Sequence, residues 1–224
     1  MGVVYLVRHG QAHAKAYGSL AEAQSSAGGL TDVGADQARR AGRALATRID
    51  RVDHAVAGSL ARQQQTLRHL LEGFADAPEP GVDAGWDEYD LGAIATGGES
   101  GGNVHGAGFQ ARLDDDLRRW TAGETTGGES YRDYRARADR ALEAVAVHAG
   151  SGQTAVAVSS AGTIAAVLAT LWGLDDERWL AVARTMINTS VTKLIAGRSG
   201  MSVVSVNDHA HVDLVDDRSV MTFR

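Results

Sequence analysis

The sequence predicts an α/β protein, a three-layer α/β/α sandwich with a mixed, mostly parallel central sheet. Two observations predict this fold class. Short runs rich in β-branched residues alternate along the chain with segments whose apolar residues recur at helical spacing, as expected when helices connect parallel strands. Near the end of the chain, two apolar runs flank a four-residue connection that contains glycine, which predicts an antiparallel hairpin.

The first half of the chain alternates strand, helix, strand and helix. Residues 3–7 are a short apolar run that stops at a charge, which is typical of a buried parallel strand. From residue 31 to residue 45 the apolar residues follow one helical face, with Thr31 or Asp32 as the N-cap. Residues 52–57 predict a second strand, and residues 60–71 a second helix.

A glycine-rich segment follows. Eight glycines lie from Gly85 to Gly108, too many for a packed element and enough for a mobile surface segment. A plain long loop and a lid over a site are both compatible with this composition. We expect a glycine-rich, lid-like segment at about residues 85–128, within one domain that spans residues 1–224.

Regular structure returns in the second half of the chain. Residues 131–145 have the apolar spacing of a long amphipathic helix. A third strand is expected at residues 154–158, followed by an apolar helix to about residue 171. The strands of the predicted hairpin are residues 191–196 and 201–206.

The composition limits the classes of partner. With 22 Lys+Arg against 28 Asp+Glu, the net charge is -6 and the pI is about 5.7, so no general positive field attracts nucleic acid or an anionic membrane. A bound anion must therefore be held by a local cluster. Only two of the basic residues are lysines, and arginine is the cation suited to bidentate contacts with phosphate.

Cysteine usage and the N-terminus bear on the compartment. Cysteine is absent, which excludes disulfides, thiolate metal sites and a cysteine nucleophile. The opening stretch MGVVYLVRHG has no basic leader region, and its apolar run ends at Arg8, too short for a signal peptide or a membrane span. We expect a cytoplasmic protein with neither nucleic acid nor membrane as a partner.

Two loops at strand ends carry residues suited to phosphate chemistry. Ligands of open α/β sheets bind beyond the carboxyl ends of the strands. After the first strand come Arg8, His9 and Gly10, which combine a guanidinium for an anion, an imidazole nucleophile and a glycine that lets the backbone approach a ligand. After the second strand, Arg62 lies in the first turn of a helix, where the helix dipole also favours anions. Arg8 and Arg62 together predict a phosphate clamp.

Six stretches of this sequence, in order, resemble those of the histidine phosphatases, the phosphoglycerate mutase-like superfamily. They are LVRHGQA (6–12), SLARQQQT (59–66), WDEYDLG (86–92), GGESYRDYRAR (127–137), AVSSAG (157–162) and NDHAHV (207–212). They cover nearly the whole chain, and the ordered set is specific where a single match would be weak. The resemblance implies the phosphoglycerate mutase-like version of the three-layer fold.

The resemblance also implies roles for individual residues. His9 would accept the phosphoryl group, Arg8 and Arg62 would bind its oxygens, and Glu88 would give a proton to the leaving oxygen. Gly10 and Gln11, in the same loop as His9, are expected to help bind the substrate. Neither a metal nor another cofactor is expected, because two arginines can stabilise the charge on the phosphoryl oxygens.

This sequence departs from the family pattern at one important position. The second active-site histidine of the family, expected in a Ser-His-Gly loop, is replaced by Ser160 within Ser159-Ser160-Ala161. A hydroxyl can donate one hydrogen bond to a phosphoryl oxygen but carries no charge, so Ser160 is expected to bind the substrate with weaker transition-state stabilisation than an imidazolium. Some similar members with RHGQA at the start also lack that histidine, so the change is compatible with a subgroup.

Two histidines near the C-terminus are candidates for a substitute. In an extended segment, His209 and His211 would point to the same face. We hypothesise that His211 approaches the pocket, binds substrate and takes part of the role of the missing imidazole. A histidine that only hydrogen-bonds the strand end is the alternative. A metal site formed with Asp213 is a poorer interpretation, because the family that the chain resembles needs no metal.

The expected function is that of a phosphomonoester hydrolase. It would act through a phosphohistidine at His9 on a small-molecule phosphate ester, a phosphorylated metabolite. The main alternative is a catalytically impaired module of the same fold that binds a phospho-ligand or a partner, which Ser160 favours. A phosphoglycerate mutase fits less well, because it must protect its phosphoenzyme from water. A homodimer through a sheet edge or a helix face would be ordinary.

Overall fold

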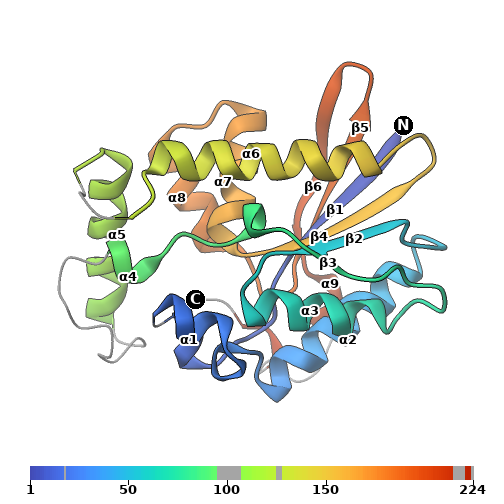
Figure 1. Cartoon of the computed structure of the whole chain (residues 1–224), viewed down its shortest axis with the longest axis horizontal. Coiled ribbons are helices and arrows are strands. Elements are labelled where there is room, and N and C mark those ends of the chain that lie inside the picture. The colour runs from blue at the N-terminus through green and yellow to red at the C-terminus, as the bar shows by residue number, and fades with distance from the viewer. Residues whose placement is uncertain (18, 95–106, 125–127, 214–219, 223–224) are drawn as a thin grey trace.

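A six-stranded sheet forms the centre of the molecule (Figure 1). The computed structural model describes residues 1–17, 19–94, 107–124, 128–213 and 220–222, with the backbone alone for residues 107–110. The strands are β1 (Gly2–Arg8), β2 (His54–Ala57), β3 (Gly81–Val82), β4 (Thr154–Ser159), β5 (Val191–Gly197) and β6 (Gly200–Asp208). Their order across the sheet is β3-β2-β4-β1-β5-β6. The β1–β4, β4–β2 and β2–β3 pairs are parallel, whereas β5 is antiparallel to β1 and β6, which confirms the predicted mixed, mostly parallel sheet.

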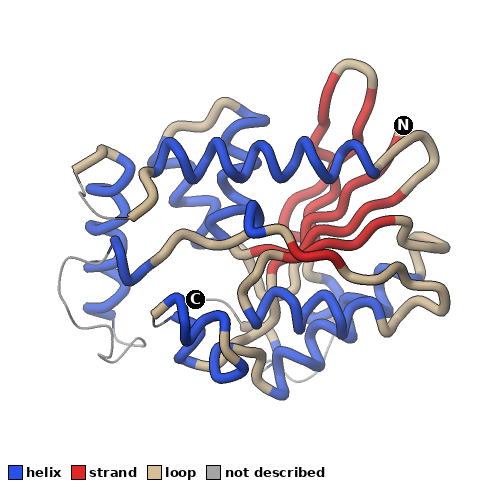
Figure 2. The backbone as a smooth tube through the Cα atoms, in the orientation of Figure 1, coloured by secondary structure: helices blue, strands red, loops and turns tan. Residues whose placement is uncertain are grey.

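Helices cover both faces of the sheet (Figure 2). The helices are α1 (Leu20–Gln24), α2 (Asp32–Ala46), α3 (Ala61–Leu71), α4 (Leu91–Ile94), α5 (Ala107–Thr121), α6 (Tyr131–His148), α7 (Ala161–Trp172), α8 (Asp176–Thr185) and α9 (Ala210–Asp213), with 3-10 turns at Ala14–Tyr17, Ser26–Gly28 and Ala84–Trp86. The helices α2 and α3 pack on one face, and α6 and α7 on the other (Figure 1). The predicted three-layer α/β/α sandwich is therefore confirmed.

Two hydrophobic cores lie on the two faces of the sheet, because side chains alternate along each strand. In β1, Val4 and Leu6 point into the core formed with α6 and α7. Tyr5 and Val7, the alternate residues, pack with α2 and α3. All four side chains are buried. Burial on both faces explains why this strand is a continuous apolar run rather than an alternating one.

The first nine residues of the helix α7 are enclosed on all sides. Every residue from 161 to 169 is buried, because the helix contacts β1, β6, α6 and α8. A helix that is apolar all round is normally an interior helix. Within the described parts of the chain, neither α7 nor any other helix is long and apolar enough to cross a membrane.

The glycine-rich segment contains more regular structure than its composition suggests. Residues 95–106 lie outside the described residues, so the lid and the plain loop are not distinguished there. On the N-terminal side, Trp86, Tyr89 and Ile94 are buried in the core. On the C-terminal side, residues 107–121 form α5, whose buried Leu113, Leu117 and Trp120 recur at helical spacing. The expectation of a segment without packed elements was wrong for these flanks.

Two further elements were not expected from the sequence. The edge strand β3 has two residues, which is too short for an apolar pattern. The buried residues of α8 are Trp179 and Leu180. Because they are neighbours in the sequence, the helix shows little apolar periodicity. The second strand begins at His54 rather than at Val52, although Val52 is buried.

An aromatic cluster anchors α5 to the rest of the protein. The ring of Trp120 lies 5.4 Å from that of Tyr89, 5.2 Å from Tyr131 and 5.3 Å from Tyr134, measured between centroids. Its Nε1 donates a hydrogen bond to the carbonyl of Glu129 at 2.8 Å. Aromatic pairs at these distances contribute beyond the area they bury. Trp120 therefore connects α5 with α6 and with the segment that precedes α4.

We expect the Trp120→Ala substitution to destabilise the protein by about 3–5 kcal/mol, because it opens a cavity in the core and removes four aromatic contacts. Trp172→Ala is the matched control, since Trp172 is 49% exposed, and it should change the free energy of unfolding by less than about 1 kcal/mol. Urea unfolding monitored by circular dichroism measures both values. Equal losses for the two variants would contradict the assignment of Trp120 as an anchor.

Candidate active site

The candidate residues meet at the carboxyl-terminal edge of the parallel strands. The last residue of β1, Arg8, is paired with Ser159, the last residue of β4. The backbone N–H of His9 donates to the carbonyl of Ser159 at 2.9 Å. Side chains that follow these strands are therefore brought to one place, which is where ligands bind in open α/β sheets.

His9 is oriented by two hydrogen bonds. Its side chain is 2% exposed, and Nδ1 lies 2.7 Å from the carbonyl oxygen of Gly10. Since a carbonyl only accepts, Nδ1 must carry the proton, which leaves a lone pair on Nε2. Arg62 Nε donates to this Nε2 at 3.2 Å. Nε2 is thus the ring nitrogen that carries the lone pair, and it accepts a hydrogen bond from the guanidinium of Arg62.

The two predicted arginines are buried and are held by backbone carbonyls. Arg62 is 3% exposed; its Nη1 donates to the carbonyl of Ala16 at 2.8 Å, and its guanidinium lies 5.3 Å from the ring centroid of Tyr17. Arg8 is 2% exposed and donates to the carbonyl of Met186, in the loop before β5. Arg62 contacts His9 directly, whereas the position of Arg8 is set by that loop.

The loop before β5 also supports the backbone of His9. Asn188 Nδ2 donates to the carbonyl oxygen of His9 at 2.9 Å, and the Thr189 N–H donates to the same oxygen at 3.3 Å. Thr189 has a positive φ of 60°, which is uncommon for a β-branched residue. Both residues are buried. The sequence carried no independent argument for this loop, because its partner is far away in the chain.

Gly10 and Gln11 are used by the fold itself. A Cβ on Gly10 would lie 2.4 Å from the carbonyl oxygen of Gly34, so glycine is required where the loop crosses α2. The Gly10 N–H donates to Thr66 Oγ1 at 3.0 Å. The Gln11 amide oxygen accepts from Thr31 Oγ1 at 2.8 Å. The close approach predicted for Gly10 is thus an approach to another backbone, and its predicted contact with substrate stays a prediction, as does that of Gln11.

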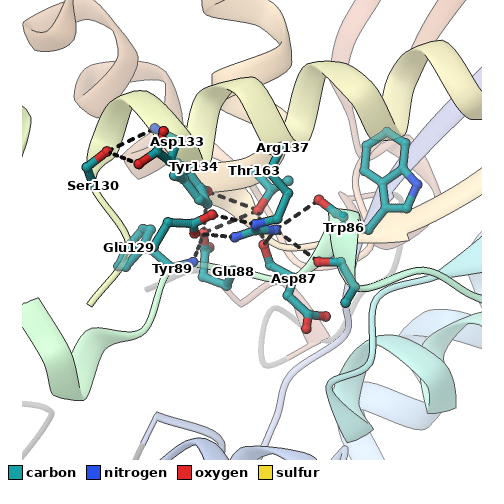
Figure 3. A network of polar contacts seen from close by, with 12 residues as sticks. Trp86, Asp87, Glu88, Tyr89, Glu129, Ser130, Asp133, Tyr134, Arg137 and Thr163 are labelled. Carbon is teal, nitrogen blue, oxygen red and sulfur yellow. Dashed lines mark hydrogen bonds and ion pairs between the residues drawn. The ribbon is translucent and has the colours of Figure 1, made fainter.

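Glu88 lies at the N-terminus of α7, where several donors meet its carboxylate (Figure 3). The hydroxyl of Tyr134 donates to Oε1 at 2.7 Å, and the Gly162 N–H donates to Oε2 at 3.0 Å. A Cβ on Gly162 would lie 2.5 Å from Oε1, so this carboxylate fits only against a glycine. Glu88 is partly buried. Its role as the proton donor stays a prediction.

Arg137 ties the segment that carries Glu88 to α6 (Figure 3). Its Nη1 donates to the carbonyls of Ala84, Gly85 and Asp87, at 3.0, 2.9 and 3.0 Å. Its Nε and Nη2 bind the two oxygens of Glu129 at 2.9 and 2.8 Å. Such a bidentate contact fixes the plane of the guanidinium. Both charged residues lie in the stretch GGESYRDYRAR, yet the sequence alone did not indicate this role.

A second carboxyl group, on the residue that precedes Glu88 in the chain, was missed by the sequence analysis. Asp87 accepts from the Ser59 N–H at 2.5 Å and from the Ser59 hydroxyl at 2.6 Å. Burial raises the pKa of Asp87 above its usual value, while the two hydrogen bonds from Ser59 and the charges of Arg137 and Arg62 oppose this shift. In the sequence, its position between Trp86 and Glu88, within the stretch WDEYDLG, could have indicated Asp87.

Ser160 occupies the predicted place at the start of α7. It is 1% exposed, and its Oγ lies 2.9 Å from Nε2 of the fully buried Gln63. An amide nitrogen only donates, so Ser160 is the acceptor and its own proton is directed elsewhere. Gln63 follows Arg62 in α3 and also donates to the carbonyl of Trp86 at 3.0 Å. Gln63 therefore links Ser160 to α3, the helix that also carries Arg62, and Arg62 binds His9.

The C-terminal histidines differ from the extended arrangement that was expected. β6 ends at Asp208 and α9 begins at Ala210, so His209 and His211 are not alternate residues of one strand. The reason is a local turn: His209 Nδ1 lies 2.5 Å from the carbonyl of Asn207, a non-glycine residue with a positive φ of 55°. Among the described residues, no three His, Cys, Asp or Glu side chains form a group that could hold a metal ion.

His211 contacts the loop before β5, which supports the backbone of His9. Its Nε2 lies 3.1 Å from Thr189 Oγ1, and the backbone of Thr189 contacts the carbonyl of His9. Burial lowers the pKa of His211 to about 4, so the ring is neutral at pH 7. A neutral ring can contribute a hydrogen bond but not the charge of an imidazolium. Its predicted contact with substrate stays a prediction.

Comparison with known proteins agrees with the fold described above. The model of the histidine phosphatase superfamily (branch 1) matches residues 4–209. The structure of a mycobacterial glucosyl-3-phosphoglycerate phosphatase with inorganic phosphate is 27% identical, covers 95% of this chain and 100% of its own, and has a TM-score of 0.67. A phosphoserine phosphatase mutant from Entamoeba histolytica, in complex with phosphoserine, is 18% identical, covers 95% and 100%, and has a TM-score of 0.69, a likeness of fold. No curated protein matches.

The neutral His211 predicts a pH dependence of stability. Its folded pKa of about 4 lies below the ordinary 6.5, so between these values the unfolded chain binds a proton that the folded chain excludes. The stability that the folded protein gains by keeping His211 neutral is complete above pH 6.5 and is lost as the pH falls toward 4. His211→Gln keeps a group that can bind Thr189 and removes the titration. From about pH 7.5 to about pH 4.5, the free energy of unfolding should fall by roughly 2–3 kcal/mol more in the wild type than in this variant.

Urea titrations at both pH values measure this difference. His13→Gln is the control, because His13 is exposed and its replacement should leave the pH dependence of the wild type intact. Parallel pH curves for the wild type and His211→Gln would show that His211 titrates normally in the folded protein.

Proposed function

The chain belongs to the histidine phosphatase superfamily (branch 1), and from this premise we propose that it hydrolyses phosphate monoesters through a phosphohistidine at His9. One observation carries the proposal. The Nδ1 of His9 is committed to the Gly10 carbonyl, so the lone pair lies on Nε2, where it accepts from Arg62 Nε. When a phosphate ester binds, Arg62 would turn to the phosphoryl oxygens and release this lone pair for attack. Phosphoryl transfer requires mainly positioning and stabilisation of negative charge, and this arrangement provides both.

In the first step, Nε2 of His9 attacks the phosphorus in line with the ester oxygen. The N–P bond forms as the P–O bond to the alcohol breaks, and the proton of Glu88 goes to the leaving oxygen. Arg8 and Arg62 stabilise the negative charge on the phosphoryl oxygens. The Gly10 carbonyl accepts from the Nδ1–H of His9 and so stabilises the positive charge that develops on the ring.

In the second step, water attacks the phosphohistidine. Glu88, now ionised, takes a proton from the water as the new P–O bond forms and the N–P bond breaks. Inorganic phosphate leaves, and the enzyme returns to its starting state with a protonated Glu88. The protein supplies all of these groups itself, and the proposal needs neither metal nor cofactor.

The proposed substrate class is a small phosphorylated metabolite. The likeness to a phosphatase of glucosyl-3-phosphoglycerate, at 27% identity, supports a small phosphate ester as the class. The net charge of -6 argues against a polyanion such as nucleic acid. The arrangement of Ser160, with its proton directed away from Gln63, suits a hydrogen bond to a phosphoryl oxygen.

Ser160 is also the observation that favours a second candidate function. Without an imidazolium at this position, a module that binds a phospho-ligand but does not turn it over would use the same arginines. Such a module would bind phosphate or vanadate, release no phosphate from any ester and acquire no phosphoryl label. A phosphoglycerate mutase would isomerise its substrate without releasing phosphate.

We expect His9→Ala to reduce phosphate release from a panel of phosphate esters by more than about 1000-fold, because it removes the attacking nitrogen. His13→Ala, which changes an exposed histidine four residues away, should retain the wild-type rate. A chelator should change neither rate. Wild-type protein should acquire an acid-labile, base-stable phosphoryl label, and His9→Ala should not. Phosphate release that survives His9→Ala would contradict the mechanism.

The Ser160→Ala substitution tests whether the uncharged Ser160 hydroxyl donates a hydrogen bond to the phosphoryl group. If the Ser160 hydroxyl donates to a phosphoryl oxygen in the transition state, its removal should lower kcat about 3- to 10-fold, the value of one neutral hydrogen bond. Ser151→Ala, at an exposed position, is the control. Steady-state kinetics on the best ester of the panel measures both variants. An unchanged kcat in Ser160→Ala would remove this residue from the binding site.

A further inference from the structure

We propose that Tyr134 and Thr163 form a hydroxyl pair that stabilises Glu88 both when it is protonated and when it is ionised. The inference rests on the proposed function, in which Glu88 must give a proton in one step and accept one in the next. In this role Tyr134 and Thr163 are positioning residues, because they contact Glu88 and not the reacting atoms. The sequence resemblance assigned nothing to either side chain.

The contacts form a short chain of oxygens (Figure 3). Tyr134 Oη lies 2.7 Å from Glu88 Oε1 on one side and 2.9 Å from Thr163 Oγ1 on the other. Thr163 Oγ1 lies 2.9 Å from the carbonyl oxygen of Asp87. The other carboxylate oxygen of Glu88 accepts from the Gly162 N–H at 3.0 Å. A backbone carbonyl, which only accepts, thus stands at one end of the chain and a titratable carboxyl at the other.

When Glu88 is ionised, its oxygens only accept. The Tyr134 hydroxyl then donates to Oε1, and the Thr163 hydroxyl donates to the carbonyl of Asp87. Both oxygens of the carboxylate therefore receive hydrogen bonds. Oε1 accepts from Tyr134 and from the Tyr89 backbone N–H at 3.2 Å, with Thr163 Oγ1 farther away at 3.4 Å, and Oε2 accepts from Gly162. Such hydrogen bonds to a charged acceptor are about twice as strong as neutral ones.

When Glu88 is protonated, the direction of one hydrogen bond reverses. Until it is passed to the leaving oxygen, the proton on Oε1 is donated to Tyr134 Oη, and the Tyr134 hydroxyl turns to donate to Thr163 Oγ1. Thr163 continues to donate to the carbonyl of Asp87. Every proton has an acceptor in both states, and only the hydroxyl of Tyr134 has to rotate. Backbone N–H donors, such as those of Tyr89 and Gly162 at Glu88, cannot reverse their direction and favour the ionised form alone.

The groups around Glu88 leave Tyr134 as a hydroxyl at all relevant pH values. Tyr134 is fully buried, and burial followed by the nearby charge of Glu88 raises its pKa well above 10. The charged or titratable side chains facing this site are Arg137 on α6, which binds Glu129, and Asp87 and Tyr89 beside Glu88. From α7, the described contacts to Glu88 are the uncharged Gly162 N–H and the Thr163 hydroxyl.

Packing alone does not require these hydroxyls. The ring of Tyr134 belongs to the aromatic cluster, with centroids 5.3 Å from Trp120 and 5.8 Å from Tyr89, a role that phenylalanine would also fill. A buried hydroxyl is costly unless it is hydrogen-bonded. The two hydroxyls are therefore buried polar groups at the place where the Glu88 carboxyl meets the hydrophobic core.

The proposal predicts opposite effects of two substitutions. In Thr163→Val, Tyr134 can still donate to ionised Glu88, but it has no acceptor when Glu88 is protonated, so the protonated form is disfavoured. In Tyr134→Phe, ionised Glu88 loses a strong hydrogen bond, so the ionised form is disfavoured. The titration midpoint of Glu88 should move down by about half to one pH unit in Thr163→Val, and up by a similar amount in Tyr134→Phe.

The experiment follows the carboxyl resonance of Glu88 by carbon-13 NMR across a pH series, with assignment by Glu88→Gln. Thr163→Ser keeps the hydroxyl and is expected to restore the wild-type midpoint. Because no substrate is present, the result tests the hydroxyl pair whether or not His9→Ala abolishes phosphatase activity. If Thr163→Val does not fold, Thr163→Ala removes the same hydroxyl and is judged by the same criterion.

A kinetic readout uses the best phosphate ester. The basic limb of the pH profile for phosphorylation of His9 should shift in the same two directions as the NMR midpoints, with Thr163→Ser as the matched control. Shifts of the same sign in Thr163→Val and Tyr134→Phe, or no shift in either folded variant, would overturn the proposal. Loss of rate without a shift in pH dependence would assign both residues a purely structural role.

Discussion

Buried guanidinium groups that donate to backbone carbonyls hold together the edge of the sheet that carries the candidate active site. Arg8 binds the carbonyl of Met186, Arg62 binds that of Ala16, and Arg137 binds three carbonyls between residues 84 and 87. Each contact joins segments that are far apart in the chain. A carbonyl orients a guanidinium through a hydrogen bond but does not neutralise it. The contacts that fix the loops around Arg8 and Arg62 are therefore compatible with a role for both charges in holding an anion.

The hydrophobic core and the candidate catalytic carboxyl meet at Tyr134. Its ring packs with the aromatic cluster that anchors α5, while its hydroxyl contacts Glu88. Packing of α5 and α6 consequently determines where this carboxyl lies relative to α7. Because protein interiors are close-packed, a change in the cluster is transmitted to the carboxyl rather than absorbed.

The charge at the site comes from arginine rather than from histidine. Ser160 provides a neutral hydroxyl at the start of α7, and His211 is held neutral by burial. Stabilisation of a phosphoryl transition state would then depend mainly on Arg8 and Arg62, which carry their charge at every accessible pH. The Ser160 hydroxyl is held by Gln63, whose side-chain amide reaches from α3 to the start of α7.

The sequence by itself determined the strand and helix alternation, the placement of His9 and Arg62 after consecutive strands, and, through the family resemblance, Glu88 and Ser160. These features have local signatures, because periodicity and strand-end loops are written in neighbouring residues. Only the tertiary structure decided the tautomer of His9, the Arg137 clamp, the packing of α5 and the neutral state of His211. Each of these depends on contacts or burial contributed by distant parts of the chain, and desolvation has no signature within a single segment.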